Sequence, residues 1–151
     1  FHVSTLISMD PDEKVIFSYP ISDFDADKYA VVATKQGLIK RIKIDKLKVN
    51  RYSKVVMATK LREGDEVVSV DMMNGDDGEI VICTKDGFMN RYDASEVSII
   101  EPASFGVKSI ELKSRPSDYV VCAKVCRDKD IIVFCQQHYF RYLNNLFFQF
   151  H

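Results

Sequence analysis

Short apolar runs separated by polar turns occupy most of the chain, and their spacing predicts strands rather than helices. Tyr29–Thr34 is a run rich in β-branched side chains, and Leu38–Ile44 is a second run across the turn formed by residues 34–37. Gly37 at the end of that turn suits a backbone with positive φ. The two runs are therefore predicted to pair as a hairpin.

The second run of this hairpin has two different faces. Ile42 and Ile44 alternate with Arg41 and Lys43. The alternation predicts that the isoleucines pack on a core while the two cations face solvent. Alternating charge of this kind is usual on a solvated strand face, so the pattern by itself does not require a ligand.

The same criteria predict further short strands on both sides of this hairpin. Long apolar periodicity at helical spacing is absent, so the predicted fold class is all-β. The further strands are Val3–Met9, Lys14–Ile21, Glu66–Met73, Ile80–Cys83, Ile131–Cys135 and Tyr139–Tyr142.

An internal repeat of about 50 residues connects these strands. The segment ATKQG at 33–37 returns as CTKDG at 83–87, and DEVV at 65–68 returns as DYVV at 118–121. Repeats of this length with four short strands each predict a propeller-like architecture. We count about three blades in one domain, roughly residues 1–61, 62–112 and 113–151.

The formal net charge of −1 conceals a strongly basic stretch. Residues 28–62 hold eleven Lys or Arg and one acid, Asp45, whereas residues 63–101 hold two bases and eleven acids. A phosphate backbone responds to such a block rather than to the sum over the chain. The block therefore favours a polyanionic partner.

Catalytic and metal-binding patterns are absent from the sequence. Cys83, Cys122, Cys126 and Cys135 lack CxxC spacing and are predicted to pack as reduced, buried side chains. The three histidines are isolated, and no phosphate-binding loop precedes a helix. We expect no catalytic site, metal or cofactor on this chain. With no span of about 20 apolar residues and no leader, a cytoplasmic protein is expected.

Several motifs in order carry a resemblance to a known family. These are ATKQGLIKR, NRY, LREGDEVVSV, CTKDGFMNRY and FGVKSIEL, which begin at residues 33, 50, 61, 83 and 105. The pattern resembles the carboxy-terminal β-pinwheel domain of the A subunit of bacterial type IIA DNA topoisomerases. Residues 99–104 lack the glycine and arginine usual in gyrase, so topoisomerase IV is the closer likeness.

The resemblance implies a non-catalytic domain that binds and bends duplex DNA along a basic rim. Such a domain presents DNA to the strand-passage core of an ATP-hydrolysing isomerase, and so supports DNA supercoiling changes and chromosome segregation. The implied partners are duplex DNA, the catalytic remainder of the same polypeptide and the ATPase subunit, near the bacterial nucleoid. The predicted DNA-binding residues are Lys35, Lys40, Arg41, Lys43, Arg51, Lys54, Lys85, Arg91 and Lys108.

A second function class fits the same repeat. A propeller-like module could use its basic blade to dock an acidic protein partner rather than DNA. The repeat alone does not separate the two hypotheses. Salt-dependent binding of duplex DNA would favour the first.

Overall fold

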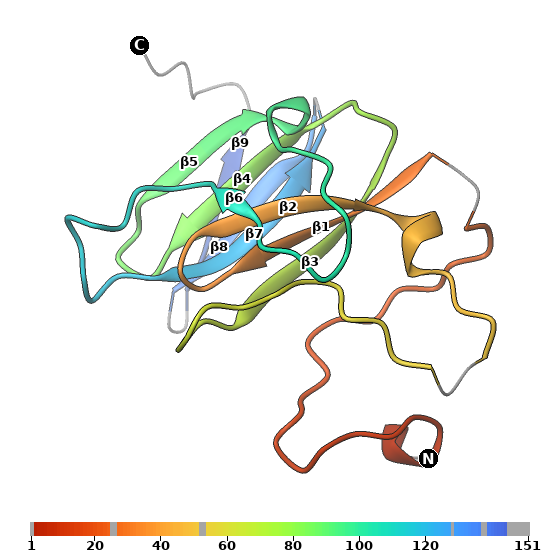
Figure 1. The fold of residues 1–151 in the computed structure, drawn as a ribbon. Helices are drawn as coiled ribbons and strands as arrows, with labels where there is room; N and C mark the ends of the chain where they lie inside the picture. The colour runs from red at the N-terminus through yellow and green to blue at the C-terminus, as the bar shows by residue number, and fades with distance from the viewer. Residues whose placement is uncertain (1, 25–26, 52–53, 128, 137–138, 145–151) are drawn as a thin grey trace.

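The computed structural model describes all residues except 1, 25–26, 52–53, 128, 137–138 and 145–151. Short strands make up nearly all of its regular structure, which confirms the predicted all-β class (Figure 1). The strands are β1 Lys28–Thr34, β2 Leu38–Lys43, β3 Val67–Asn74, β4 Glu79–Thr84, β5 Met89–Asp93, β6 Val107–Lys108, β7 Val120–Cys126, β8 Ile131–Gln136 and β9 Tyr139–Asn144. In the described residues, three single-turn 3₁₀ helices accompany them: η1 Val3–Thr5, η2 Ile44–Leu47 and η3 Ala94–Glu96.

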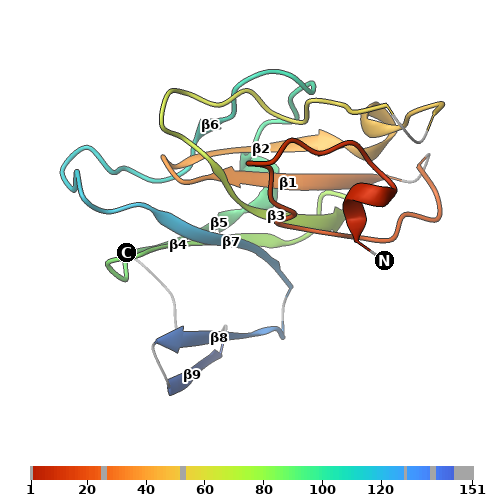
Figure 2. The same ribbon diagram turned by 90° about the horizontal axis from the view of Figure 1, so that it is seen from below.

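The strands form two antiparallel sheets and a separate hairpin. Sheet A has the order β3-β1-β2-β6, sheet B has the order β5-β4-β7, and β8 pairs with β9. Figure 2 shows sheet B lying between sheet A and the β8–β9 hairpin. The chain enters sheet A through β1 to β3, forms β4 and β5 in sheet B, returns to sheet A as β6 and reaches sheet B again as β7.

The two repeated turns have the same local structure. In the first, Gly37 has φ 83° and donates its N–H to Thr34 O at 3.0 Å, while Thr34 Oγ1 accepts from Leu38 N at 3.2 Å. In the second, Gly87 has φ 87° and Thr84 accepts the matching bonds, each at 3.1 Å. The repeat seen in the sequence is therefore a repeat of hairpin geometry.

The main core lies between sheets A and B. It includes inward-facing side chains of β1, β2, β3, β4 and β7, among them Val31, Met73, Ile82 and Ala123. Two polar contacts also join the sheets. Ser69 Oγ donates to Ala123 O at 2.7 Å, and Asp71 Oδ2 accepts from Val125 N at 3.0 Å.

The N-terminal strands predicted at Val3–Met9 and Lys14–Ile21 are wrong. Residues 3–5 form η1, and 14–21 belong to no strand. Val15 and Ile16 are more than half exposed, so the alternating pattern is not buried. A strand requires a partner backbone as well as a suitable pattern, and in the described structure these residues pair with none.

Three of the four cysteines agree with the prediction of reduced side chains. Cys83 and Cys126 are buried, Cys122 is half-buried, and all three are free thiols. The side chain of Cys135 and the turn residues Gln137 and His138 lie outside the part of the structure that is described.

Candidate nucleic-acid interface

The connection from β2 to β3 carries the densest exposed positive charge. We call residues 43–62 the basic loop; it begins at the last residue of β2 and includes η2. Seven bases and one acid, Asp45, lie in it, giving a formal charge of +6. Figure 2 shows this connection, in orange and yellow, on the side of sheet A that faces away from sheet B. The seven exposed cations are Lys43, Lys46, Lys48, Arg51, Lys54, Lys60 and Arg62.

Most of these cations are not neutralised by a nearby carboxylate. Lys46 Nζ lies 3.4 Å from Glu101 Oε1, in a pair whose members are both largely exposed. Within the described residues, Lys43, Arg51 and Lys54 have no ion-pair partner. Their charge is therefore available to a ligand in solvent.

Lys40 does not face solvent, which removes it from the predicted DNA-binding surface. Its side chain is only 1% exposed, and Nζ donates to Glu101 O at 3.2 Å and to Ser104 O at 2.9 Å. Burial lowers the pKa of the Lys40 ammonium group. The residue fastens segment 101–104 over β2, so its role is structural.

Arg41 is also buried, contrary to the prediction that it shares a solvent face with Lys43. It is 4% exposed, and its guanidinium donates to Val97 O at 2.7 Å and pairs with Asp76 Oδ1 at 2.5 Å. The reason is that Arg41 lies on the same face of β2 as Ile39 and opposite Val31 of β1, and both of these residues belong to the core between the sheets. Only Lys43, at the end of β2, remains exposed.

The buried and exposed cations are connected through one segment. Ser104 O accepts from Lys40 Nζ and also from the backbone N–H of Lys60 at 3.0 Å, while Met57 O accepts from Ala103 N at 2.9 Å. The last part of the basic loop therefore runs beside segment 101–104. Lys40 positions the loop without reaching its surface.

The turns of the two repeats each place a lysine near the ring of one tyrosine. Lys35 Nζ lies 4.9 Å and Lys85 Nζ 5.7 Å from the centroid of the Tyr119 ring. Lys35 also pairs with Glu66 at 2.6 Å, and this hydrogen bond raises the pKa of Lys35 and lowers that of Glu66. Lys85 is exposed and has no carboxylate partner among the described residues.

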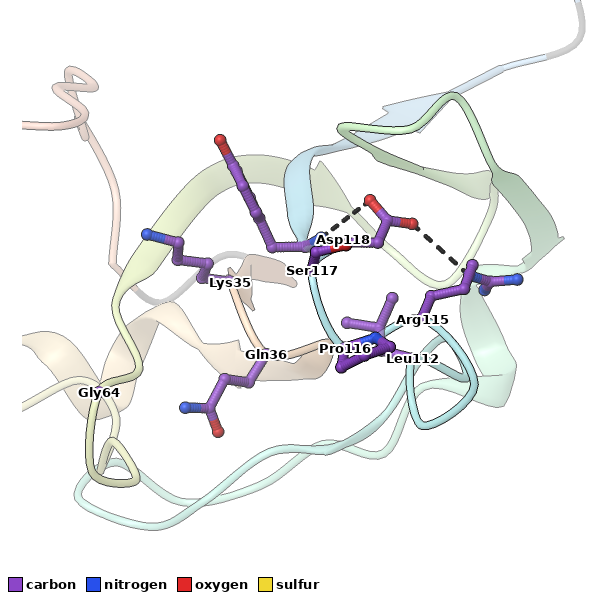
Figure 3. A pocket seen from close by; sticks show the side chains of 9 residues that line it. Lys35, Gln36, Gly64, Leu112, Arg115, Pro116, Ser117 and Asp118 are labelled. Carbon is purple, nitrogen blue, oxygen red and sulfur yellow. Dashed lines mark hydrogen bonds and ion pairs between the residues drawn. The ribbon is translucent and has the colours of Figure 1, made fainter.

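A shallow hollow of about 380 Å³ lies beside this group (Figure 3). Asp118 and Arg115 form one wall, with Asp118 Oδ2 3.5 Å from Arg115 Nε. The hollow is lined by Lys35, Gln36, Gly64, Leu112, Arg115, Pro116, Ser117, Asp118 and Tyr119. Because both signs of charge line it, it is a weaker anion site than the basic loop.

The remaining predicted site residues carry partners. The side chain of Arg91 is 19% exposed and donates from Nε to Glu79 Oε2 at 2.8 Å. Lys108 is exposed, but its Nζ pairs with Glu111 Oε2 at 2.8 Å. The second repeat also exposes several acids, which are Asp76, Asp77, Asp86, Asp93 and Glu96. Its surface is consequently poorer in free positive charge than the first.

Four exposed cations were missing from the predicted set of binding residues. They are Lys46, Lys48, Lys60 and Arg62, all in the basic loop. The available signal was the absence of strand alternation in residues 45–62, since a connection outside a sheet leaves most side chains in solvent.

The described part of the chain offers neither a metal site nor a membrane-spanning helix. No group of three His, Cys, Asp or Glu side chains there is placed to hold a metal ion. None of the described helices has the length and apolar character required to cross a bilayer.

Comparison with known proteins identifies the class. A family model described as "DNA gyrase C-terminal domain, beta-propeller" matches residues 28–72 and 78–127. The chain therefore belongs to this family of C-terminal domains of type IIA topoisomerase A subunits. Among solved structures, the C-terminal domain of DNA topoisomerase IV superposes with a TM-score of 0.84 at 31% identity, over 96% of this chain and 45% of that one.

Curated relatives point to the same enzyme. The A subunit of DNA topoisomerase 4 from Bacillus subtilis (strain 168) is 34% identical over 90% of this chain, and its counterpart from Staphylococcus aureus (strain MRSA252) is 36% identical over 90%. The chain spans 16% and 17% of their lengths. A DNA gyrase A C-terminal domain has a TM-score of 0.79 at 20% identity, over 96% of this chain and 47% of that one, which shows a shared fold. The likeness to topoisomerase IV stated from the motifs is confirmed.

Proposed function

We propose that this chain is a non-catalytic domain that binds and bends duplex DNA for a type IIA topoisomerase of the topoisomerase IV kind. The observation that carries the proposal is the basic loop, with seven exposed cations against one acid in twenty residues. In this proposal the domain presents a DNA segment to the strand-passage core in the bacterial cytoplasm. Its protein partners are the catalytic remainder of the same polypeptide and the ATPase subunit.

The chemistry of the loop supports contact with phosphates rather than bases. Lysine and arginine are mixed along an irregular connection, and apart from the single-turn η2 the described part of the loop forms no helix or two-stranded ribbon that could enter a major groove. Such contacts attract the DNA backbone without reading its sequence. Preference among duplexes then follows from how easily each one bends.

The distribution of charge supports a dominant role for the first repeat. The basic loop belongs to the connection between β2 and β3, whereas the second repeat exposes mostly acids around β4 and β5. Lys85 and Lys35 extend the positive surface toward Tyr119 and form a secondary contact region. Because Lys40 and Arg41 are buried, we exclude them from the proposed contacts.

A labelled duplex titrated with charge-reversal variants tests the proposal. Lys43→Glu combined with Lys54→Glu should weaken binding by at least about tenfold at low salt. The matched control reverses two exposed lysines elsewhere, Lys113→Glu and Lys129→Glu, and should change affinity much less. Absence of duplex binding by the unaltered chain would instead favour a module that docks an acidic protein.

A further inference from the structure

Two thiols face each other on the side of sheet B opposite the main core. Cys83 lies on β4 and Cys122 on β7, and they pack in a small cluster with Val81, Met89 and Cys126. The neighbouring residues Ile82 and Ala123 point the other way, into the core between the sheets. This second face of sheet B has no part in the proposed DNA contacts.

The register places the two cysteines directly opposite one another. In the antiparallel β4–β7 ladder, Cys83 is the Cα partner of Cys122. Opposed residues in such a ladder have Cα atoms about 4.5–5.5 Å apart, and disulfides span Cα separations of about 4.4–6.8 Å. The ladder also shifts register immediately after Cys83, which gives the backbone a local irregularity at the pair.

The thiols differ in access and in acidity. Cys83 is 7% exposed, whereas Cys122 is half-buried and so can be reached by a small reagent. The Cys83 thiol donates a hydrogen bond to the Cys122 sulfur, and this bond together with the charge of Lys124 lowers the pKa of Cys122 to about 7. The same contact, followed by burial, raises the pKa of Cys83. A thiolate at Cys122 is thus paired with a protonated neighbour, as in reactive dithiols.

Cys126 does not compete for either member of the pair. It lies on the same strand and face as Cys122, four residues further on, so the two Cα atoms are about 13 Å apart. Its register partner is Glu79 rather than a cysteine. Burial raises the pKa of Cys126, which leaves it a weaker nucleophile than Cys122.

We propose that Cys83 and Cys122 form a redox-active dithiol, which small oxidised thiols convert to a disulfide joining β4 and β7. The Cys122 thiolate attacks one sulfur of the small disulfide and releases one thiolate, leaving a mixed disulfide. Cys83 then loses its proton to solvent, attacks the Cys122 sulfur and expels the second thiolate. The pair gives up two electrons and two protons, and the small disulfide becomes two thiols.

Tryptic mapping can identify the bond without ambiguity. Cleavage at lysine and arginine, but not before proline, places Cys83 in peptide 63–85, Cys122 in 114–124, Cys126 in 125–127 and Cys135 in 130–141. The full-length protein that contains this chain is treated with oxidised glutathione, alkylated under denaturing conditions and digested. We expect a peptide 63–85 joined to 114–124 that disappears on reduction.

Three variants distinguish the steps. Cys83→Ser should halt the reaction at a glutathione adduct on peptide 114–124, Cys122→Ser should abolish both products, and the matched control Cys126→Ser should leave the cross-link unchanged. Alkylation of both Cys83 and Cys122 after oxidation, or a bond involving peptide 125–127 or 130–141 instead, would overturn the proposal. If a variant fails to fold, the peptide map of the unaltered protein still tests the proposal, because it shows whether peptides 63–85 and 114–124 become joined.

Discussion

Asp118 holds the turn of the second hairpin through the backbone of Asp86: its Oδ1 accepts the Asp86 N–H at 3.0 Å and the N–H of Tyr119 at 2.9 Å. Asp65 does the same in the first repeat, where Oδ1 accepts from Gln36 N at 2.8 Å and from Glu66 N at 3.0 Å. Each aspartate thus joins a hairpin turn to the strand that begins two residues later in the chain. This shared geometry explains why DEVV and DYVV recur.

The clamp at Asp118 should make stability depend on acidity. Burial alone would raise the pKa of Asp118, but hydrogen bonds from Thr84 and from the N–H groups of Asp86 and Tyr119 lower it below its ordinary value. A carboxylate with a lowered folded-state pKa adds stability above about pH 4, and this is lost as pH falls through the folded-state pKa. The Asp118→Asn variant should therefore be less stable than the parent protein at pH 7, and it should lose less stability than the parent when the pH is lowered. Urea unfolding at pH 7 and at pH 3 measures the stability of the variant and of the parent protein, and the exposed substitution Asp77→Asn is the control. If Asp118→Asn and the parent lose the same stability between pH 7 and pH 3, the proposed role of Asp118 is contradicted.

Substitution of Lys40 should lower stability, whereas substitution of Lys43 should weaken DNA binding. Lys40→Met removes both hydrogen bonds to segment 101–104 and should lower the free energy of unfolding by about 1–3 kcal/mol. Lys43→Met alters an exposed side chain, so unfolding should change by less than about 0.5 kcal/mol while duplex affinity falls. Denaturant unfolding and DNA titration on the same samples give the comparison. Equal stability of the two variants would show that the buried ammonium contributes little.

The two turn glycines should respond differently to the same substitution. Both have positive φ, which costs a residue with a Cβ about 1–2 kcal/mol. A Cβ at Gly37 would also come within 3.3 Å of Ile110 Cγ2 and Ile110 O, whereas one at Gly87 would meet nothing within 4 Å. Gly37→Ala should therefore be the more destabilising change by about 1 kcal/mol. A thermal or denaturant series on the two variants tests this, and the reverse order would be inconsistent with the tight contact.

Salt should weaken DNA binding in proportion to the phosphates contacted. If three to five cations of the basic loop touch phosphates, the logarithm of affinity should fall against the logarithm of salt with a slope of roughly −3 to −4.5. The Lys43→Glu, Lys54→Glu variant should show a shallower slope because it makes fewer contacts. Titrations at several salt concentrations give both values, and a flat response would remove the phosphate-binding proposal.

The sequence supplied the local parts of the fold. The hydrogen bonds that close the turns at Gly37 and Gly87 join residues within five positions of one another, so the repeated TKxG pattern predicted these turns correctly. The strand predicted at Lys14–Ile21 failed because pairing depends on a partner far along the chain, which alternation alone cannot provide.

The candidate site was predictable by region but not by residue. A count of charges located the positive surface between residues 28 and 62, whereas strand periodicity assigned Arg41 to solvent. Arg41 is instead covered by a segment more than fifty residues later, through its bond to Val97 O. No pattern within β2 predicts contact with this distant segment. The burial of Lys40 and Arg41 therefore could not be predicted without the tertiary structure.

The path of the chain within sheet A determines what cleavage of the basic loop would do. The basic loop connects β2 to β3, yet β3 is hydrogen-bonded to β1 along its length and β6 is hydrogen-bonded to β2. A protease that cuts the exposed loop therefore divides the polypeptide into two pieces that remain held side by side in one sheet. The nicked protein should migrate as a single species under native conditions and as two fragments only after denaturation.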